Sequence, residues 1–471
     1  MRFMHNPEAP MQRALATLAT AALIALPLPV QAAAMPDDAE IAQILADRID
    51  RDQANVAISV AVIEDGVPRF VSHGTLSRDD PTPVDEHTLF EAGSITKVMT
   101  NLLLAQLVVD GQIDLDAPLT DYLPEGTILP ERDGKPITAF DLATHTSGFS
   151  GLPEELIAKG AANPYSGYGA DALMAWIAAY ELPRAIGETF EYSNVGIALL
   201  AQAIEHVSGR PYAELLQEQI LDPLGMSETS LATAPGAIAG MATGHDAAGE
   251  PVANWDMEAF APVGALVSNT ADLAKFIAAA SGAVDSPLDP AFSIMLDRTR
   301  PTGGAGEVIG LGWFNLTEGG RDIAWHNGIT GGYRSFAGYD RKTGNGVVVL
   351  SSMVTEAGIE DIGLHLLDST LPLRPQPKPR EVAEIDPAIL PDYAGQYLLA
   401  PGVIIAITAE AGQLFAQLTG QQRFEIFPES EKRFFFRVVD AQITFADPID
   451  GAAPALTLHQ NGQNMTAIRI P

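Results

Sequence analysis

The chain has 471 residues, a net charge of −33 and a pI of about 4.4. A surface this acidic repels phosphate backbones, which argues against nucleic acid and anionic membrane surfaces as partners. The sequence contains no cysteine, so disulfides, thiolate nucleophiles and cysteine-based zinc or iron–sulfur sites are excluded. The length favours two or three domains over a single core.

The first 34 residues have the pattern of a secretory signal peptide. Arg2 and Arg13 precede an apolar stretch at 14–30, and the A-x-A-like cleavage site Ala32-Ala33-Ala34 follows it. We therefore expect an exported protein, periplasmic or secreted, without stable membrane insertion after cleavage. An uncleaved membrane anchor is the alternative, although the stretch is short for a bilayer span. Met11 is an alternative start.

Beyond this segment, hydrophobic periodicity predicts a helix over 41–51 and two strands over 56–63 and 69–73, with a hairpin turn at 64–66. Helical patterns then dominate, at 95–109, 170–180, 196–208, 212–220 and 271–280. Strands at 333–339 and 346–351 and a helix at 359–367 close the region. Strands at both ends with helices between them predict an antiparallel sheet covered by helices, with a helical insertion, in a domain spanning 36–370.

A proline-rich segment at 371–391 predicts a stiff linker. Residues 392–471 then carry about eight short alternating runs separated by turn residues, which indicates a small all-β barrel or sandwich. This segment has no cluster of ionisable residues suited to catalysis. We therefore expect the chemistry in the first domain.

Ser94 and Lys97 form the first candidate catalytic pair. A serine hydroxyl is a poor nucleophile until a base takes its proton. The two residues are three apart where a helical pattern begins, so their side chains lie on one helix face. Burial would lower the pKa of Lys97 toward that of a neutral base. A helix-capping serine beside an unrelated surface lysine is the alternative interpretation.

The second candidate group is Tyr192-Ser193-Asn194, directly before a strong helical pattern. A phenol there can relay a proton, and a carboxamide can hold a substrate carbonyl. The alternative is a turn in which Asn194 caps the helix.

The third group is His326-Asn327-Gly328-Ile329, in a glycine-rich stretch that we expect to enter the strand at 333–339. Glycines at a strand start let the backbone approach a ligand closely. The backbone N–H groups of Ile329 and Ser94 together can form an oxyanion hole. A hairpin turn with a surface histidine is the alternative. No H-E-x-x-H or comparable ligand pattern occurs among the nine histidines, so we predict no metal site and no cofactor.

In this order, S-x-x-K, Y-S-N and H-N-G resemble the three-motif signature of the penicillin-recognising serine hydrolases. The closest likeness is to the class C β-lactamase and D-alanyl-D-alanine carboxypeptidase family. Phrases such as FEAGSITKVM, ITAFDLATHTSGF, GETFEYSNVGIALL and TGGYRSFAGYD extend the resemblance over most of 55–368. It implies a β-lactamase/transpeptidase-like α/β (α+β) fold with the site between the sheet and an all-helical subdomain. The C-terminal domain, 392–471, resembles lipocalin-like barrels appended to some members.

The resemblance implies a role for each motif residue. Ser94 is the nucleophile, Lys97 its base or proton relay, and Tyr192 assists proton transfer to the leaving group. The implied substrate-binding residues are Asn194, His326, Asn327, Gly328 and Ile329.

Two further motifs are excluded from the predicted site. His145-Thr146-Ser147-Gly148 resembles a structural turn of the family. Lys342-Thr343-Gly344 spells the third motif of many β-lactamases, yet it falls in the turn between two predicted strands.

His326 and Asn327 depart from the family pattern, since β-lactamases usually carry lysine and then Thr or Ser at these places. Histidine is only partly charged near neutral pH. We therefore expect an exported serine hydrolase that acts through an acyl-enzyme intermediate on an ester, amide or peptide of D-amino-acid or cell-wall type, with weak or no β-lactamase activity. The alternatives are a penicillin-binding or peptidoglycan-sensing protein that acylates without efficient turnover, and a true class C-like β-lactamase.

Overall fold

The computed structural model describes residues 35–159, 163–232, 238–355, 357–376, 382–400, 403–419, 423–437, 441–460 and 463–470. The expected signal segment, 1–34, lies outside the described residues, as do residues 377–381 of the expected linker. Within the described ranges, no helix combines the length and apolar character needed to cross a bilayer.

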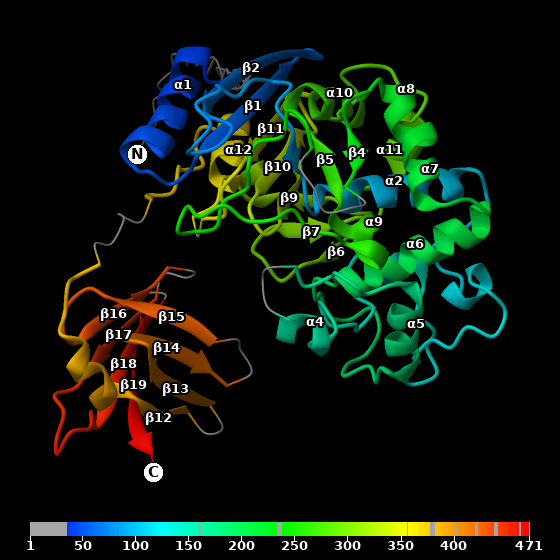
Figure 1. Cartoon of the computed structure of the whole chain (residues 1–471). Helices are drawn as coiled ribbons and strands as arrows, with labels where there is room; N and C mark the ends of the chain where they lie inside the picture. Colours follow the sequence, from blue (N-terminus) through cyan, green and yellow to red (C-terminus); the bar gives the residue numbers. More distant parts are fainter. Residues whose placement is uncertain are drawn as a thin grey trace, which may run out of the picture. The chain divides into compact units, whose positions relative to one another are not determined.

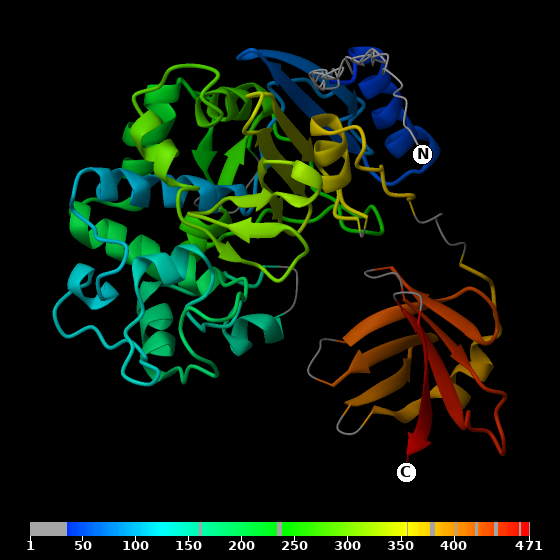
Figure 2. The ribbon, with the colours of Figure 1, turned by 180° about the vertical axis from the view of Figure 1, so that it is seen from behind.

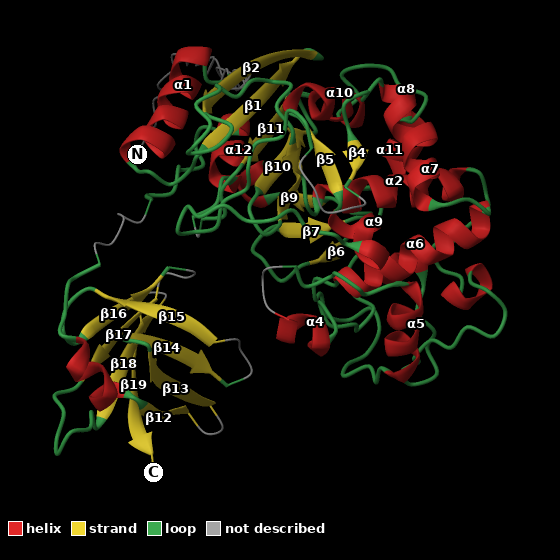
Figure 3. Cartoon of the chain, viewed as in Figure 1, coloured by secondary structure: helices red, strands yellow, loops and turns green. Residues whose placement is uncertain are grey.

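An antiparallel sheet forms the first part of the fold, with the strand order β2-β1-β11-β10-β9-β8-β7-β6 (Figures 1 and 3). Its strands are β1 Ala57–Glu64, β2 Val67–Gly74, β6 Arg300–Pro301, β7 Glu307–Ile309, β8 Phe314–Leu316, β9 Ile323–Ile329, β10 Arg334–Asp340 and β11 Gly346–Ser351. The early strand β1 pairs with the late strand β11, so the sheet joins segments from the two ends of this region. This arrangement confirms the predicted antiparallel sheet.

Both faces of the central strands are covered, and strand alternation decides which side chains face which layer. On β11, Val347 and Val349 pack with α1 (Asp38–Ala46) and α12 (Glu360–Leu367). Val348 and Leu350 belong to the apolar cluster on the other face, where α10 (Thr270–Ala280) lies. Figure 2 shows α1 and α12 on the side of the sheet away from α10. A continuous valine run suits a strand buried on both sides.

The remaining elements of this region lie between β2 and β6 in the sequence. The helices are α2 Ile95–Val109, α3 Ala139–Ala143, α4 Glu154–Lys159, α5 Ala170–Ala179, α6 Asn194–Ser208, α7 Tyr212–Leu216, α8 Asp222–Leu224, α9 Ala261–Gly264 and α11 Asp289–Ile294. A small second sheet has the order β3-β5-β4, from Phe90–Glu91, Leu266–Ser268 and Ser230–Leu231. Short π-helical turns extend α1 through Asp47–Arg51 and α7 through Gln217–Leu221.

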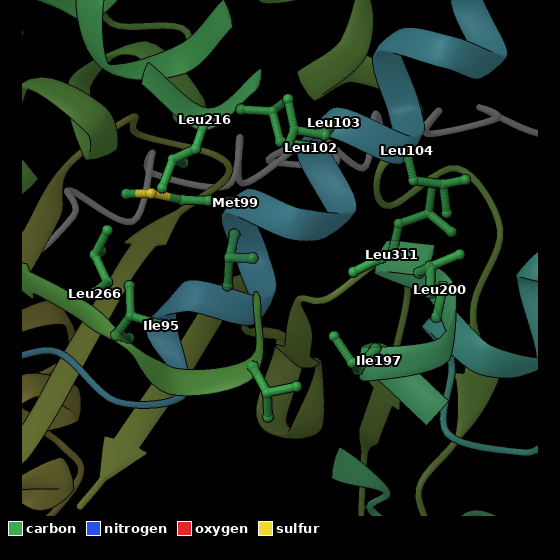
Figure 4. Packing of buried hydrophobic residues seen from close by; sticks show 14 of the residues in the cluster. Ile95, Met99, Leu102, Leu103, Leu104, Ile197, Leu200, Leu216, Leu266 and Leu311 are labelled. Carbon is green, nitrogen blue, oxygen red and sulfur yellow. The ribbon is translucent and has the colours of Figure 1, made fainter. Parts of the chain in front are cut away.

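Helix α2 runs through the centre of the large apolar cluster (Figure 4). Met99, Leu102 and Leu103 on this helix are almost completely buried, in the same apolar cluster as Leu200 of α6 and Leu216 of α7. Each such side chain contributes about 1.5–3 kcal/mol when fully buried. The helix that begins at the predicted nucleophile is therefore firmly fixed by packing.

Several predicted elements agree with the structure closely, and others were missed. Helix α2 and strand β11 have the predicted bounds, and the turn expected at Lys342-Thr343-Gly344 connects β10 to β11. Strands β6 to β9 were not predicted. The glycine-rich stretch that begins at His326 was expected to lead into the strand at 333–339, whereas residues 326–329 form the end of a separate strand, β9, that precedes β10.

The C-terminal residues form a closed antiparallel barrel, which confirms the predicted all-β fold. Its strands are β12 Gly395–Ala400, β13 Val403–Glu410, β14 Gln413–Leu418, β15 Arg423–Pro428, β16 Arg433–Phe436, β17 Ala441–Phe445, β18 Ala455–Gln460 and β19 Gln463–Ile470. The barrel has its own apolar core, to which the 3₁₀ helix Pro387–Tyr393 contributes Leu390 and Tyr393. The boundaries of the signal, catalytic, linker and barrel segments stay predictions.

Candidate active site

Ser94 stands at the point where α2 begins. Gly93 directly before it has φ +52°, a left-handed conformation that glycine adopts without strain. Ser94 occupies the N-cap position, yet its side chain makes no capping hydrogen bond. The capping-serine interpretation is therefore not supported, and the hydroxyl is available to other partners.

Lys97 lies one helical turn further along, and its amine is next to the serine. The Nζ atom is 2.7 Å from Ser94 Oγ and donates to the carbonyl of Val263 in α9 at 3.0 Å. The side chain is almost fully buried, at 1% exposure. Burial lowers the pKa of Lys97 well below its usual value of 10.5. A lysine with a lowered pKa at hydrogen-bond distance from a serine has the chemistry of a general base.

Tyr192 lies on the loop before α6, with its ring against Lys97. The Lys97 Nζ atom is 4.9 Å from the centre of the phenol ring. The ring of His145 lies 4.5 Å away and that of His326 6.2 Å away, measured between ring centres. Burial raises the pKa of the Tyr192 phenol, while its interaction with the Ser94 hydroxyl opposes the rise. The phenol is therefore protonated at neutral pH and can serve as a proton donor.

Asn194 is the first residue of α6, and it does not cap the helix. Ser193 is the cap, with its side chain accepting from Gly196 N. The Asn194 amide Nδ2 donates to the Tyr165 hydroxyl at 3.2 Å. Its Oδ1 atom is buried and has no hydrogen-bond partner among the described residues. The carboxamide oxygen can therefore accept a hydrogen bond from a bound molecule.

His326 lies on β9 and is almost fully buried. Its Nδ1 is 2.6 Å from the backbone oxygen of Asn327, which makes Nδ1–H the donor and leaves Nε2 as an acceptor. Nε2 is buried and unpartnered in the part of the chain that the structure describes. Burial, reinforced by Lys97, lowers the pKa of His326 to about 3. The third motif thus presents a neutral imidazole.

Gly328 and Ile329 bring the backbone of β9 against the start of α2. A Cβ atom on Gly328 would stand 2.1 Å from the carbonyl oxygen of Ala92 and 2.9 Å from Ser94 N. A Cβ atom on Gly93 would stand 2.9 Å from Ile329 N. Both glycines are thus required for the two segments to meet, and the N–H groups expected to form the oxyanion hole belong to segments in direct contact.

Asn327 differs from the other predicted residues, because its side chain lies on the opposite face of the sheet from His326. Its amide Nδ2 donates to Glu360 of α12 at 2.8 Å, and Glu360 also pairs with Arg334 at 3.1 Å. The structure therefore does not place the Asn327 side chain beside Ser94, and only its backbone reaches the site, by accepting from His326. Asn327 was expected to bind substrate because β-lactamases usually carry Thr or Ser at this place.

Two residues near the site were missed by the sequence analysis. Glu91 of β3 is buried, accepts from Asn254 Nδ2 at 2.8 Å and from Trp255 N at 3.2 Å, and has its pKa raised by burial. His145 was assigned to a structural turn, and it also contacts the Tyr192 ring. The roles of these two residues could not be found from sequence spacing, because the residues that they contact are distant in the sequence. Across the described residues, no group of three or more His, Asp or Glu side chains is arranged to hold a metal ion.

Comparison with known proteins gives matches for both parts of the chain. Residues 41–369 match the family model described as beta-lactamase, and residues 379–468 match a domain of unknown function, DUF3471. The D-alanyl-D-alanine-carboxypeptidase/endopeptidase AmpH of Escherichia coli K12 is 32% identical over 197 residues, 42% of this chain and 50% of that protein. The match thus spans half the length of that relative.

Longer matches are more distant in sequence. Penicillin-binding protein 4* of Bacillus subtilis strain 168 is 28% identical over 432 residues, 84% of this chain and 91% of that protein. The octameric penicillin-binding protein homologue from Pyrococcus abyssi superposes with a TM-score of 0.61 at 22% identity, covering 92% of this chain and all of that one. The structural likeness establishes the fold.

The depressed pKa of Lys97 predicts how stability depends on pH. Between the folded-state pKa and 10.5, the unfolded chain binds a proton that the native chain does not, so stability rises with pH in that window. Each pKa unit is equivalent to about 1.4 kcal/mol. We expect Lys97→Met to be more stable than the wild type at pH 7, with a smaller advantage at pH 10.

Urea unfolding followed by tryptophan fluorescence measures this difference, because all four tryptophans precede residue 371. Lys342→Met, at an exposed lysine, is the control. Its difference in stability from the wild type should be the same at pH 7 and pH 10. An advantage of Lys97→Met that is equal at pH 7 and pH 10 would show that Lys97 is charged in the fold.

Proposed function

Because the chain belongs to the beta-lactamase family, we propose that it is an exported serine hydrolase that forms an acyl-enzyme intermediate at Ser94. The family makes it a serine hydrolase of the β-lactamase and penicillin-binding type. The observation that carries the residue assignment is the 2.7 Å contact between the buried Lys97 amine and the Ser94 hydroxyl. Export is proposed on the pattern of residues 1–34.

The proposed reaction begins when neutral Lys97 takes the proton of Ser94 Oγ, which attacks the substrate carbonyl carbon. The backbone N–H groups of Ser94 and Ile329 receive the oxyanion. Tyr192 gives its proton to the leaving group and regains one from Lys97, so the amine is neutral again. The ester on Ser94 is then hydrolysed by a water that loses its proton to the same pair, and the Oγ–H bond re-forms. In this scheme Asn194 Oδ1 accepts from a substrate N–H.

The absence of charge on His326 in the third motif supports a substrate that has a neutral group at that position. His326 is uncharged, with its pKa lowered to about 3 by burial, so it offers no cation to a substrate carboxylate. Arg334, which pairs across the sheet with Ile329, is bonded to Glu360. We therefore propose an ester, amide or peptide without a required free carboxylate as the substrate, with weak or no β-lactamase activity. Among such substrates, the endopeptidase activity in the name of AmpH favours peptides of D-amino acids that are cleaved at an internal bond.

Hydrolysis of short-chain p-nitrophenyl esters, D-amino-acid amides, D-Ala-D-Ala peptides and nitrocefin tests the nucleophile. We expect turnover of at least one neutral ester or amide, and a fall in kcat of about 10³-fold or more for Ser94→Ala, because this variant lacks the hydroxyl that forms the acyl-enzyme. Ser227→Ala, at an exposed serine, is the matched control and should retain wild-type activity. Equal activity of the wild type and Ser94→Ala on every substrate would refute the assignment.

The same panel, with a fluorescent penicillin added, separates the alternatives. A penicillin-binding or sensing protein would be labelled once by a fluorescent penicillin and release no product, whereas a true class C-like β-lactamase would turn over nitrocefin faster than any ester.

His326→Lys tests the role of charge in the third motif. In β-lactamases a lysine at this place is suited to binding a substrate carboxylate, and a hydrogen bond to a charged group contributes about 1.5–3 kcal/mol. We expect the ratio of kcat/KM for nitrocefin to that for a neutral ester to rise by about tenfold or more. The uncharged His326→Gln variant is the control, and an equal change for both substrates, or the same ratio in both variants, would contradict the charge argument.

A further inference from the structure

The loop that carries Tyr192 lies along a second segment, residues 145–151. Two backbone hydrogen bonds join the segments near their ends, from Gly187 N to Thr146 O at 2.7 Å and from Asn194 N to Gly151 O at 3.0 Å. The hydroxyl of Ser193 donates to the Ser150 carbonyl at 2.8 Å. These hydrogen bonds to segment 145–151 thus stabilise the conformation of the Tyr192 loop.

His145 contacts the Tyr192 loop at three points around the tyrosine. Its backbone carbonyl accepts from the N–H of Glu191, the preceding residue, at 2.8 Å. Its Nδ1 accepts from the N–H of Ser193, the following residue, at 3.1 Å. Its ring lies against the phenol, with 4.5 Å between ring centres and 35° between planes. His145 therefore holds the residues before and after Tyr192 by hydrogen bonds, and its ring packs against one face of the phenol.

The hydrogen bond to Ser193 requires a particular form of the imidazole. Nδ1 can accept only when it carries no proton, so the ring is neutral with its proton on Nε2. An imidazolium would set two N–H groups against each other. Burial, together with the nearby Lys97 and His326, lowers the pKa of His145 well below its usual value, which keeps the accepting form.

The backbone of His145 is constrained as well. Its φ is +53°, in the left-handed region that histidine and asparagine enter more readily than most residues. The preceding helix α3 is held by a capping box between Thr138 and Asp141, and Asp141 also receives Arg300 at 2.7 Å. The turn that presents the imidazole is therefore anchored independently of Tyr192.

We propose that His145 is a positioning residue, which holds the Tyr192 phenol in reach of Ser94 and Lys97 during proton transfer. This inference rests on the proposed function, in which Tyr192 passes a proton to the leaving group. Proton transfer requires hydrogen-bond distances, so a small displacement of the phenol slows the chemical step more than it weakens substrate binding.

Two substitutions separate the contacts of His145. His145→Asn keeps a side-chain acceptor near the Nδ1 position and tolerates the left-handed backbone, but removes the ring. His145→Phe keeps a ring of similar size but removes the acceptor. Each is made in the wild type and in Tyr192→Phe, with folding checked by circular dichroism and the thermal midpoint, and kcat and KM are measured on the best neutral ester.

We expect each single His145 variant to lower kcat by about 10- to 100-fold with KM nearly unchanged. In the Tyr192→Phe background, the same substitutions should change kcat by less than about 2-fold, because residues that act through one group are not additive. Equal losses in both backgrounds, or no loss in the wild-type background, would overturn the proposal.

A readout independent of activity distinguishes failure of this inference from failure of the proposed function. The protein is labelled with 3-fluorotyrosine, and the Tyr192 resonance among the ten tyrosines is assigned by its loss in Tyr192→Phe. We expect one sharp ¹⁹F line in the wild type and a shifted, broadened or multiple line in both His145 variants. An unchanged line overturns the positioning role, even if no hydrolase activity is found. If the ¹⁹F line responds but Ser94→Ala is as active as the wild type, only the proposed function fails.

Discussion

The contact between the buried amine of Lys97 and the hydroxyl of Ser94 is the interaction on which the site depends. An amine in water is protonated at neutral pH and cannot accept a proton. Burial is the cause that lowers the pKa of Lys97, and the amine is held by the Ser94 hydroxyl and the Val263 carbonyl. Burial of this amine destabilises the fold, because it disfavours the charged form that the unfolded chain keeps in water. The apolar packing of α2 offsets the penalty and fixes both residues at once.

Segments distant in the sequence meet at the start of α2, and each supplies a different part of the site. The loop before α6 supplies the Tyr192 phenol, α9 supplies a carbonyl to Lys97, and β9 supplies the neutral His326 and the backbone of Ile329. The sheet makes this meeting possible, since β9 lies two strands from β11, which pairs with the early strand β1. Acid–base chemistry is therefore assembled by tertiary contacts, with only the Ser94–Lys97 pair set by local helix geometry.

That division explains which features were predictable from the sequence. Helix α2 and the Ser94–Lys97 contact follow from a period of 3.6, which local pattern reveals. The position of Gly328 within a strand could not be predicted from local pattern. This glycine is needed because the backbone at Ala92 and Ser94 comes very close to it, and not because the chain turns there. The direction of the Asn327 side chain depends on the register of β9, and the contact of His145 with Tyr192 depends on two loops packed together, neither of which a local pattern records.

The central claim is that Lys97 is uncharged at neutral pH, and a titration of its side chain tests this directly. In protein labelled with ¹³Cε-lysine, one of the seven lysine resonances should be absent in Lys97→Met and identify this residue. We predict that its chemical shift titrates well below 10.5 and that it is the shift of a neutral amine in the folded protein at pH 7. A Lys97 resonance that titrates near 10.5 would contradict the account.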